Sequence, residues 1–567
     1  MASSEVEPAK TILLTSVANT IERFPLREGS FSYGTAGFRT LWERLPSVVN
    51  RMGILAALRS RAKGGQGVGA VVTASHNPIF DNGVKLVDPD GGMLSPAWEG
   101  YATRLANASQ YDVLLTVSDI IEREHIDLST VGKVFIARDT RPSGEILVDG
   151  LLEGAKAVGA HVEDLGVLTT PQLHYAVRYS NLNSKSSSLQ GYMENIVTAF
   201  RKLVELNPKG SDVKIDPIKV DCANGVGAIH LKHLAEMLSP LAEYRIYNDG
   251  TEGVLNEGCG AEHVKSLQVY PIGLDAAPNE HCCSLDGDAD RIMFFYNNGE
   301  TSGHAEGDGF KLLDGDRMAS LLAGFIHNFV LEAELDKELS MTVIQTAYAN
   351  GNSTSYLTGQ LKLQVMCTST GVKYLHAKAL EHDIGVYFEA NGHGTVLFSD
   401  KALQLILAGV ESNPDPDSSK KARSFHILLQ LSDLLNQAVG DAFSDMLAVQ
   451  IALLYRGWSY IDWINCYSDL PNRLAKVRVR DRSIVKTTDA ERRCVSPPGL
   501  QDVIDRMVKE VSKGRAFVRP SGTEDIVRVY AEAETNKLVD ELSNGVIAAV
   551  FEIAGGVDGK QTHKSSK

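Results

Sequence analysis

The stretch Gly69–Leu86 reads GAVVTASHNPIFDNGVKL, and it decides the class of fold. Its apolar run GAVV stops at the polar corner TASHNP, residues 73–78. A short apolar run bounded by turn signals is typical of a buried strand. Because ligands of α/β folds gather at the carboxyl ends of strands, we expect chemistry in this corner.

The same pattern recurs along the chain in KVFIARD, IKVDCAN, CCSLDGD, VYFEANG and AFVRPSG. Longer helical patterns such as PAWEGYATRLANAS alternate with these runs, which predicts an α/β protein. A chain of 567 residues exceeds one hydrophobic core, so we expect three to five domains, on the order of 100 to 200 residues each. After Ser468 the runs LAKVRVRD and IVRVYAEAE indicate a smaller α+β domain.

Composition narrows the class of partner. The net charge is −15, with 43% hydrophobic and 22% charged residues, which indicates a folded acidic protein. An acidic surface disfavours nucleic acid and anionic membranes, no apolar stretch is long enough to span a bilayer, and MASSEVEPAKTILL lacks the features of a signal peptide. We therefore expect a cytoplasmic protein with neither a nucleic-acid nor a membrane partner.

The seven cysteines form no CxxC pair, and their number is odd. This pattern suggests neither a disulfide framework nor a zinc site, so buried free thiols are the preferred interpretation.

Ser75 is the candidate nucleophile of the TASHNP corner. A serine held at a strand end can carry a phosphoryl group, although taken alone the motif is more typical of a capping serine in an Asn-Pro turn. A Ser-His-Asp hydrolase is a further alternative. Adjacent side chains of an extended segment point apart, so we expect His76 to be poorly placed to activate Ser75.

The second corner, SLDGDADR at 284–291, offers Asp286, Asp288 and Asp290. Alternate residues of an extended segment face the same way, so three hard oxygen ligands can converge, as Mg²⁺ requires. A calcium EF-hand is disfavoured because Arg291 and Asn297 stand where glycine and glutamate are needed, whereas a solvated acidic hairpin stays open as an alternative. The similar DGDR at 314–317 is predicted to be a helix surface.

The third corner, FEANGHG at 388–394, offers Glu389, Asn391 and Gly392. Acceptors and donors of this kind read sugar hydroxyls, and glycine permits close backbone approach to a ligand. Taken alone, the segment is more typical of a plain hairpin turn.

The fourth corner, RPSGTED at 519–525, combines an arginine fork, two hydroxyls and exposed backbone N–H groups, which is the chemistry of a phosphate cradle. An ordinary serine-rich turn is the alternative. The candidate substrate-binding residues are Arg519, Ser521, Gly522, Thr523 and, on the next strand, Arg528.

In this order the four corners resemble the α-D-phosphohexomutase superfamily from about residue 30 to about residue 535. The resemblance implies a heart-shaped molecule of four domains around a central cleft, three of them mixed α/β and the last a smaller α+β domain. It implies a phosphoserine-bearing domain, a metal-binding domain, a sugar-binding domain and a phosphate-binding domain, which we place at residues 1–185, 186–305, 306–455 and 456–567.

The resemblance also assigns roles. It implies that Ser75 is phosphorylated, that one Mg²⁺ is held by Ser75, Asp286, Asp288 and Asp290, and that a sugar 1,6-bisphosphate serves as activator and intermediate. Positions matching YGTAGFR at 33–39, DNGVK at 81–85 and the neighbouring corners are implied to take part in proton transfer and charge stabilisation. These catalytic candidates are Arg39, His76, Lys85, Arg291 and His393.

Within the superfamily the chain resembles the branch that acts on N-acetylglucosamine phosphates. Asn391 stands where glucose and mannose mutases commonly have serine, and ARDTR at 137–141 follows the serine corner instead of preceding it. LTTPQLH at 168–174 and QTAYANG at 345–351 are similar to the same branch. The resemblance implies an isomerase that supplies UDP-N-acetylglucosamine biosynthesis; a glucose or mannose phosphate mutase and a non-catalytic sugar-phosphate binder are the alternatives.

Overall fold

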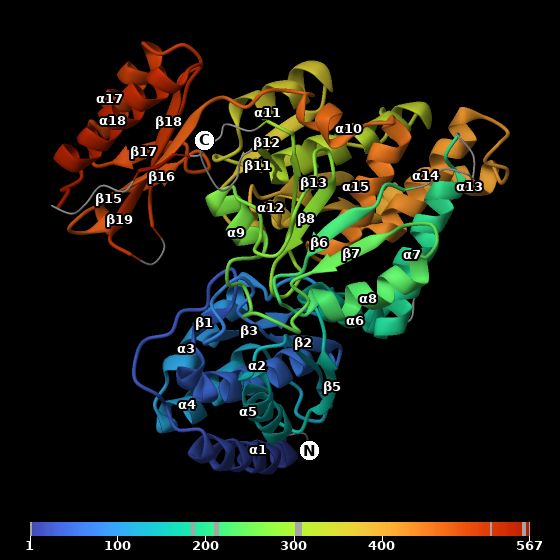
Figure 1. Ribbon diagram of the computed structural model, residues 1–567. Helices are drawn as coiled ribbons and strands as arrows, with labels where there is room; N and C mark the ends of the chain where they lie inside the picture. The colour runs from blue at the N-terminus through green and yellow to red at the C-terminus, as the bar shows by residue number, and fades with distance from the viewer. Residues whose placement is uncertain are drawn as a thin grey trace. The chain divides into compact units, whose positions relative to one another are not determined.

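The computed structural model describes residues 3–182, 187–208, 215–300, 309–521, 524–557 and 563–565. The chain forms two compact units. Figure 1 labels their helices and strands. The first comprises residues 1–314, 391–397 and 403–460, and the second comprises residues 315–390, 398–402 and 461–567. None of the described helices combines the length and the apolar character needed to cross a bilayer.

The first sheet of the first unit has five strands in the order β1-β3-β2-β4-β5. β2, β4 and β5 are parallel, and β3 pairs antiparallel with both β1 and β2. Every residue of β2 is buried, so the predicted GAVV strand is confirmed. The strands are β1 (Phe38–Leu41), β2 (Gly67–Val72), β3 (Asp81–Val87), β4 (Lys133–Arg138) and β5 (His161–Val167).

Helices cover both faces of this sheet. Val68, Ala70 and Val72 of β2 join the core formed with α1 to α5, whereas Val71 packs in the cluster that contains residues of α6. Because β2 lies in the middle of the sheet, the TASHNP corner emerges at its centre. The helices are α1 (Ser3–Arg23), α2 (Pro46–Ala62), α3 (Pro96–Asn107), α4 (Gln110–Arg123), α5 (Gly144–Ala157) and α6 (Thr170–Leu182), with the short helix η1 (Trp42–Arg44).

The second sheet has the order β10-β9-β8-β6-β7 and places β8 at its centre. β6, β7 and β8 are parallel, and β8 turns back into antiparallel β9, so the aspartate corner is the turn of this hairpin. The sheet extends past residue 305 because β10 pairs with β9. The strands are β6 (Ile218–Asp221), β7 (Tyr244–Tyr247), β8 (His281–Leu285), β9 (Ile292–Asn297) and β10 (Phe310–Leu313).

The helices α7 (Leu189–Glu205), α8 (Gly227–Leu238), α9 (Ala261–Leu267), α14 (Lys420–Leu434) and α15 (Ala442–Arg456) complete the first unit. β14 (Gly394–Phe398) and α13 (Asp400–Ser412) lie where the chain passes between the units.

The second unit contains a parallel arrangement of β12, β11 and β13 and a separate antiparallel sheet in the order β18-β19-β15-β20. Helices α17 (Leu500–Lys509) and α18 (Asn536–Ile553) pack on the antiparallel sheet, which confirms the α+β character predicted after Ser468. The strands are β11 (Met341–Thr346), β12 (Gln364–Thr368), β13 (Ile384–Phe388), β15 (Asn472–Arg478), β16 (Lys486–Thr488), β17 (Arg493–Ser496), β18 (Arg515–Pro520), β19 (Ile526–Glu532) and β20 (His563–Ser565).

The remaining helical segments are α10 (Gly315–Glu332), α11 (Gly351–Ser355), η2 (Tyr356–Gln360), α12 (Val372–Ala379), α16 (Tyr460–Ile464), η3 (Arg482–Ile484), α17 (Leu500–Lys509) and α18 (Asn536–Ile553).

The DGDR segment at 314–317 is not the helix surface that its sequence predicts. Asp316 and Arg317 are 7% and 3% exposed in the first turn of α10. Arg317 donates to the carbonyl oxygens of Ile464 and Tyr467. A side chain at Gly315 would collide with the Glu389 carbonyl, so this turn packs directly against the end of β13, and that tertiary contact buries the charges.

Candidate active site

The serine corner is a tight turn. Ser75 is fully buried and has φ +51, in the left-handed region that few residues other than glycine adopt. Its backbone N–H donates to Thr73 Oγ1 at 2.9 Å, and its hydroxyl donates to Asp286 Oδ2 at 2.5 Å. The turn therefore points the hydroxyl at the aspartate corner of the second sheet.

The prediction that the side chains of Ser75 and His76 point apart is wrong. The His76 Nδ1 atom lies 3.4 Å from Ser75 Oγ, because the left-handed turn replaces the extended backbone on which that expectation relied. Burial, with the nearby charges of Arg291 and Arg39, lowers the pKa of His76 to about 3. The imidazole is therefore neutral at pH 7 and can accept a hydrogen bond.

Asp286, Asp288 and Asp290 converge by a different route from the one predicted. Each offers a carboxylate oxygen, and these oxygens lie within 4.8 Å of one another in a buried cluster. The segment is a turn and not extended: Ala289 has φ +55, and its N–H donates to the Asp286 carbonyl. Asp286 Oδ1 accepts from the backbone N–H groups of Asp290 and Arg291, which fixes the first carboxylate.

This cluster needs a cation. Burial, together with the charges of Asp290 and Asp288, raises the pKa of Asp286 well above its usual range. Asp288 Oδ1 is buried and, among the described residues, has no hydrogen-bond partner. Three converging buried carboxylate oxygens with one left unpartnered suit a hard divalent ion, so the residues present fit Mg²⁺.

Basic side chains surround the aspartates. Lys85 Nζ lies 3.3 Å from Asp290 Oδ2 and 3.8 Å from Asp288 Oδ2, and His393 Nδ1 lies 3.2 Å from Asp290 Oδ1. Burial alone would raise the pKa of Asp290, but His393, Lys85 and Arg291 hold it well below its usual range. Asp290 thus stays ionised more readily than Asp286.

Two arginines complete this side of the site. Arg291 Nε lies 3.6 Å from Asp290 Oδ1. Arg39 stands on β1 opposite Gly83 of β3, and its pKa is lowered by burial and by Arg291 while Asp288 opposes that shift. The first unit therefore brings all five catalytic candidates to Ser75 and the three aspartates.

Two threonines that the sequence motifs did not assign to the site donate hydrogen bonds to buried carboxylates in it or beside it. Thr73 Oγ1 donates to Asp139 Oδ2 at 2.7 Å, and Thr170 Oγ1 donates to Asp288 Oδ2 at 2.7 Å. The Thr170 backbone N–H also donates to the Asp288 carbonyl. Thr73 opens the TASHNP corner and its partner Asp139 lies in ARDTR, whereas Thr170 lies in LTTPQLH; the sequence indicated the last two segments only as marks of a branch.

The third corner meets the aspartate hairpin through its glycine. Gly392 has φ +84, and a Cβ atom there would stand 1.9 Å from the Ile292 carbonyl at the start of β9. Asn391 Oδ1 accepts from the His393 N–H at 3.1 Å, which orients the loop. Glu389, directly after β13, falls in the second unit.

The fourth corner lies between β18 and β19 of the second unit. Arg519 stands directly opposite Arg528, and Arg528 directly opposite Lys476 of β15. Opposite residues of an antiparallel pair share one face, and a row of three like charges is unfavourable unless an anion lies among them. Within the described residues, no ion pair neutralises Arg528.

Arg519 already has two partners. Its Nε atom donates to the Tyr348 hydroxyl at 2.9 Å, and its Nη1 atom lies 3.4 Å from Glu491 Oε1. Ser521 is 4% exposed and donates its N–H to the Ile526 carbonyl. Gly522 and Thr523 lie outside the described residues.

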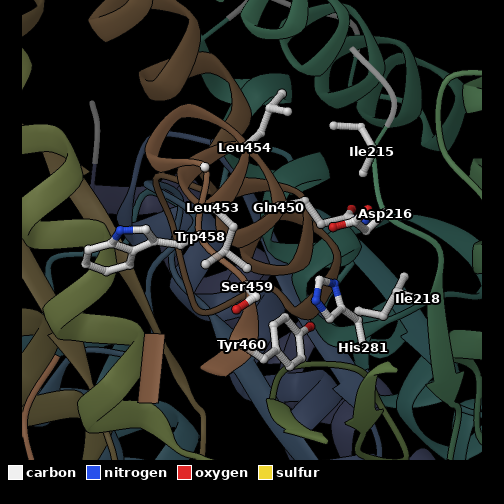
Figure 2. A pocket seen from close by; sticks show the side chains of 11 residues that line it. Ile215, Asp216, Ile218, His281, Gln450, Leu453, Leu454, Trp458, Ser459 and Tyr460 are labelled. Carbon is white, nitrogen blue, oxygen red and sulfur yellow. The ribbon is translucent and has the colours of Figure 1, made fainter. Parts of the chain in front are cut away.

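The first unit also contains a cavity of about 280 Å³ (Figure 2). It is lined by the start of β8 and by the end of α15, and there His281 stacks on Tyr460 with ring centroids 3.9 Å apart. Asp286 directly follows the opposite end of β8. The cavity and the aspartate cluster therefore lie at opposite ends of this strand, and the cavity is not the site described above.

The chain matches four family models: phosphoglucomutase/phosphomannomutase α/β/α domain I at residues 57–112 and 111–186, phosphoacetylglucosamine mutase AMG1 domain II at 184–293 and domain III at 314–458, and the phosphoglucomutase/phosphomannomutase C-terminal domain at 474–549. It is 47% identical over 527 residues to the phosphoacetylglucosamine mutase of Homo sapiens, covering 93% of this chain and 94% of the relative. The Saccharomyces cerevisiae relative of the same name is 42% identical over 544 residues, covering 92% and 95%.

Solved structures give the same picture. Aspergillus fumigatus N-acetylphosphoglucosamine mutase in complex with GlcNAc-6P and magnesium is 44% identical, with a TM-score of 0.89 over 96% of this chain and 99% of that chain. A serine-to-alanine variant of the Aspergillus enzyme, in complex with glucose 1,6-bisphosphate, has a TM-score of 0.86 at 43% identity over 96% and 99%.

Proposed function

The chain belongs to the phosphoacetylglucosamine mutase family, and we propose that it interconverts N-acetylglucosamine 6-phosphate and N-acetylglucosamine 1-phosphate through a phosphoserine at Ser75. The observation that carries this proposal is the 2.5 Å hydrogen bond from Ser75 Oγ to Asp286, which sets the hydroxyl against three converging carboxylates. The product class is the sugar 1-phosphate from which UDP-N-acetylglucosamine is made.

In the proposed reaction, phosphorylated Ser75 gives its phosphoryl group to the free hydroxyl of the bound monophosphate. The P–Oγ bond breaks, a bond forms between phosphorus and the sugar oxygen, and the hydroxyl proton passes to a base of the site. The resulting bisphosphate reverses its orientation in the site and returns its other phosphoryl group to Ser75. Mg²⁺ held by Asp286, Asp288, Asp290 and the phosphoserine would offset charge on the transferring group.

Proton transfer needs a group close to Ser75 Oγ or to the aspartates. His76 is neutral and 3.4 Å from the serine hydroxyl, and Lys85 and His393 both contact Asp290. We assign acid–base roles to Lys85 and His393, with Arg39 and Arg291 stabilising charge on the transferring phosphoryl group.

Substrate recognition is proposed to use the other two corners. Glu389, Asn391 and Gly392 would read the sugar, as their acceptors, donors and close backbone approach allow. The cationic row containing Arg519 and Arg528, with Ser521, Gly522 and Thr523, would hold the phosphate that is not reacting. A phosphate there would replace Glu491 as the partner of Arg519.

We further propose four domains near the expected boundaries 1–185, 186–305, 306–455 and 456–567, with the second extended to Leu313. The four family segments support this division, as does the presence of one sheet of four or five strands in each range. β10 supports the extension because it completes the second sheet.

The test is a coupled assay that compares N-acetylglucosamine 6-phosphate with glucose 6-phosphate, run on wild type and Ser75→Ala. We expect a higher kcat/KM for the N-acetylated sugar, no turnover by Ser75→Ala, and a phosphate on Ser75 of active wild type by intact mass. Preference for glucose 6-phosphate would identify a glucose mutase instead. Turnover by Ser75→Ala would refute the phosphoserine mechanism.

A further inference from the structure

The backbone of the serine corner is held by two side chains that bind the same pair of carbonyl oxygens. Arg141 Nη2 donates to the carbonyls of Ser75 and Asn77, both at 2.9 Å. Asn256 Nδ2 donates to the same two carbonyls at 2.9 and 3.0 Å. Each oxygen therefore uses both of its acceptor positions, one toward the first sheet and one toward the second.

Arg141 is fully committed to this corner. Its Nη1 atom donates to the carbonyls of Pro78 and Asp81, and its Nε atom donates to Asp139 at 3.0 Å. Together with the two bonds from Nη2, all five N–H groups of the guanidinium are used. Asp139 also accepts a hydrogen bond from Thr73, so the loop after β4 is hydrogen-bonded to residues on both sides of Ser75.

Asn256 approaches from the loop after β7, 181 residues along the chain from Ser75. It has φ +61, and its N–H donates to the Ala223 carbonyl, so its own backbone is fixed. Gly287 of the aspartate turn packs on the carbonyl oxygen of Ser75, since a Cβ atom at Gly287 would stand 2.5 Å from that oxygen. The second sheet thus contacts the Ser75 carbonyl at two points.

We propose that Arg141 and Asn256 are positioning residues that hold Ser75 in its left-handed conformation, with Oγ aimed at Asp286. A non-glycine residue in this region is strained, and the conformation persists only where neighbouring groups hold it in place. Four hydrogen bonds to two carbonyls supply that constraint. This inference rests on the proposed role of Ser75 as phosphoryl carrier.

The choice of carbonyls distinguishes positioning from catalysis. Neither Arg141 nor Asn256 donates to Ser75 Oγ, so the hydroxyl can gain and lose a phosphoryl group without any change in the two anchors. We therefore expect losses in the rate of phosphoryl transfer and not in the binding of sugar phosphate.

Asn256→Gly is the decisive variant, because glycine adopts positive φ freely and the substitution removes the amide without straining the backbone. The probe is glucose 1,6-bisphosphate with unphosphorylated full-length protein. In that reaction the Oγ–P bond forms, the P–O bond to the sugar breaks, and the serine proton ends on the sugar oxygen of the glucose monophosphate released. We expect phosphorylation, followed by rapid quench and intact mass, to slow about tenfold to a hundredfold, with KM for the sugar phosphate changed less than about twofold.

Asn224→Gly is the matched control. Asn224 also has positive φ, +53, and its Nδ2 donates to the Val254 carbonyl and not to the serine corner. We expect a similar shift in melting temperature with phosphorylation near the wild-type rate. Arg141→Lys keeps a charge beside Asp139 but loses the fork, and should slow phosphorylation in the same direction as Asn256→Gly.

The positioning role is overturned if Asn256→Gly is phosphorylated at the wild-type rate. It is also overturned if Asn224→Gly loses as much of the phosphorylation rate as Asn256→Gly does. Ser75→Ala in the same series separates the two ideas. If it still takes up phosphate, the phosphoserine mechanism itself fails; if it does not while Asn256→Gly reacts normally, only the positioning role fails.

Discussion

Ser75 combines a hydroxyl with a backbone conformation that few side chains tolerate. Its φ of +51 places it where a branched Cβ meets the neighbouring backbone most severely. The serine is also fully buried, so no outward rotation can relieve a larger side chain. Shape therefore restricts the residue type at position 75 as much as the chemistry of the proposed phosphoryl carrier does.

Ser75→Thr tests this restriction, since threonine keeps the hydroxyl. We expect kcat to fall at least about a hundredfold and the free energy of unfolding to fall by about 1 to 2 kcal/mol, because the added methyl group conflicts with the left-handed turn. Steady-state kinetics and denaturant unfolding measure the two effects. A threonine variant that is phosphorylated at the wild-type rate would show that the turn adapts easily.

Thr170 supplies the hydrogen bond that orients Asp288. Thr170→Val removes the hydroxyl at nearly constant volume, and we expect metal affinity to fall about tenfold because outer partners fix the ligand carboxylate. Binding of Mn²⁺ to the unphosphorylated protein, followed by electron paramagnetic resonance, gives a readout independent of turnover. Thr169→Val is the control, because Thr169 Oγ1 accepts from the Gln172 N–H, whereas the hydroxyl that donates to Asp288 is that of Thr170. Equal losses in both variants would contradict the assignment.

At the scale of elements, the strands were predictable and their turns were not. GAVV and CCSL are confirmed as β2 and β8, since a buried apolar run bounded by turn residues is a local signal. The positive φ of Ser75 and Ala289 could not be predicted, because neither serine nor alanine favours that conformation. The burial of Arg317 and the contact of Asn256 with the serine corner depend on partners distant in sequence, so no local pattern could show them.

The antiparallel sheet aligns Lys476, Arg528 and Arg519 across β15, β19 and β18. Arg519→Ala should lower kcat/KM about tenfold to a hundredfold, since a charged hydrogen bond to phosphate contributes roughly 1.5 to 3 kcal/mol. More free bisphosphate should also escape per turnover. Lys476 is more exposed, so Lys476→Ala should cost only about twofold to threefold. If Arg519→Ala changes neither kcat/KM nor the release of bisphosphate, Arg519 does not hold the phosphate.

The contact between α8 and the end of β5 predicts a pH dependence of stability. His230 of α8 donates its Nε2–H to the Val167 carbonyl at 3.1 Å, and burial lowers the pKa of His230 to about 4. Between about pH 6.5 and pH 4 the unfolded chain binds this proton and the folded chain does not, so stability falls as the pH falls through that window. The loss is at most about 3 kcal/mol.

His230→Gln keeps a donor for the carbonyl without the titration. Urea unfolding at several pH values should show that the variant loses about 1 to 3 kcal/mol less than wild type between pH 6.5 and pH 4. His161→Gln, at an exposed position of β5, should follow the wild-type profile. Parallel profiles for wild type and His230→Gln would contradict the assignment.

At the scale of the whole molecule, the buried aspartates couple metal binding to stability. Repulsion among Asp286, Asp288 and Asp290 opposes folding without a cation, so Mg²⁺ should raise the melting temperature; at one hundred times its dissociation constant the gain is about 2.7 kcal/mol. Asp288→Asn should unfold at a higher temperature than wild type in chelator, yet gain less from Mg²⁺. Thermal scans with and without Mg²⁺ measure both, and an unchanged response in Asp288→Asn would exclude that carboxylate as a ligand.

The order of segments in the two units has a consequence for truncated forms of the protein. The chain leaves one unit for the other after residues 314, 390, 397, 402 and 460, so neither unit is a continuous piece of sequence. A premature stop codon near residue 400 would remove α14 and α15 from the first unit and the antiparallel sheet from the second. Expression of either half from a split gene should therefore yield insoluble material, whereas co-expression of both halves could restore assembly.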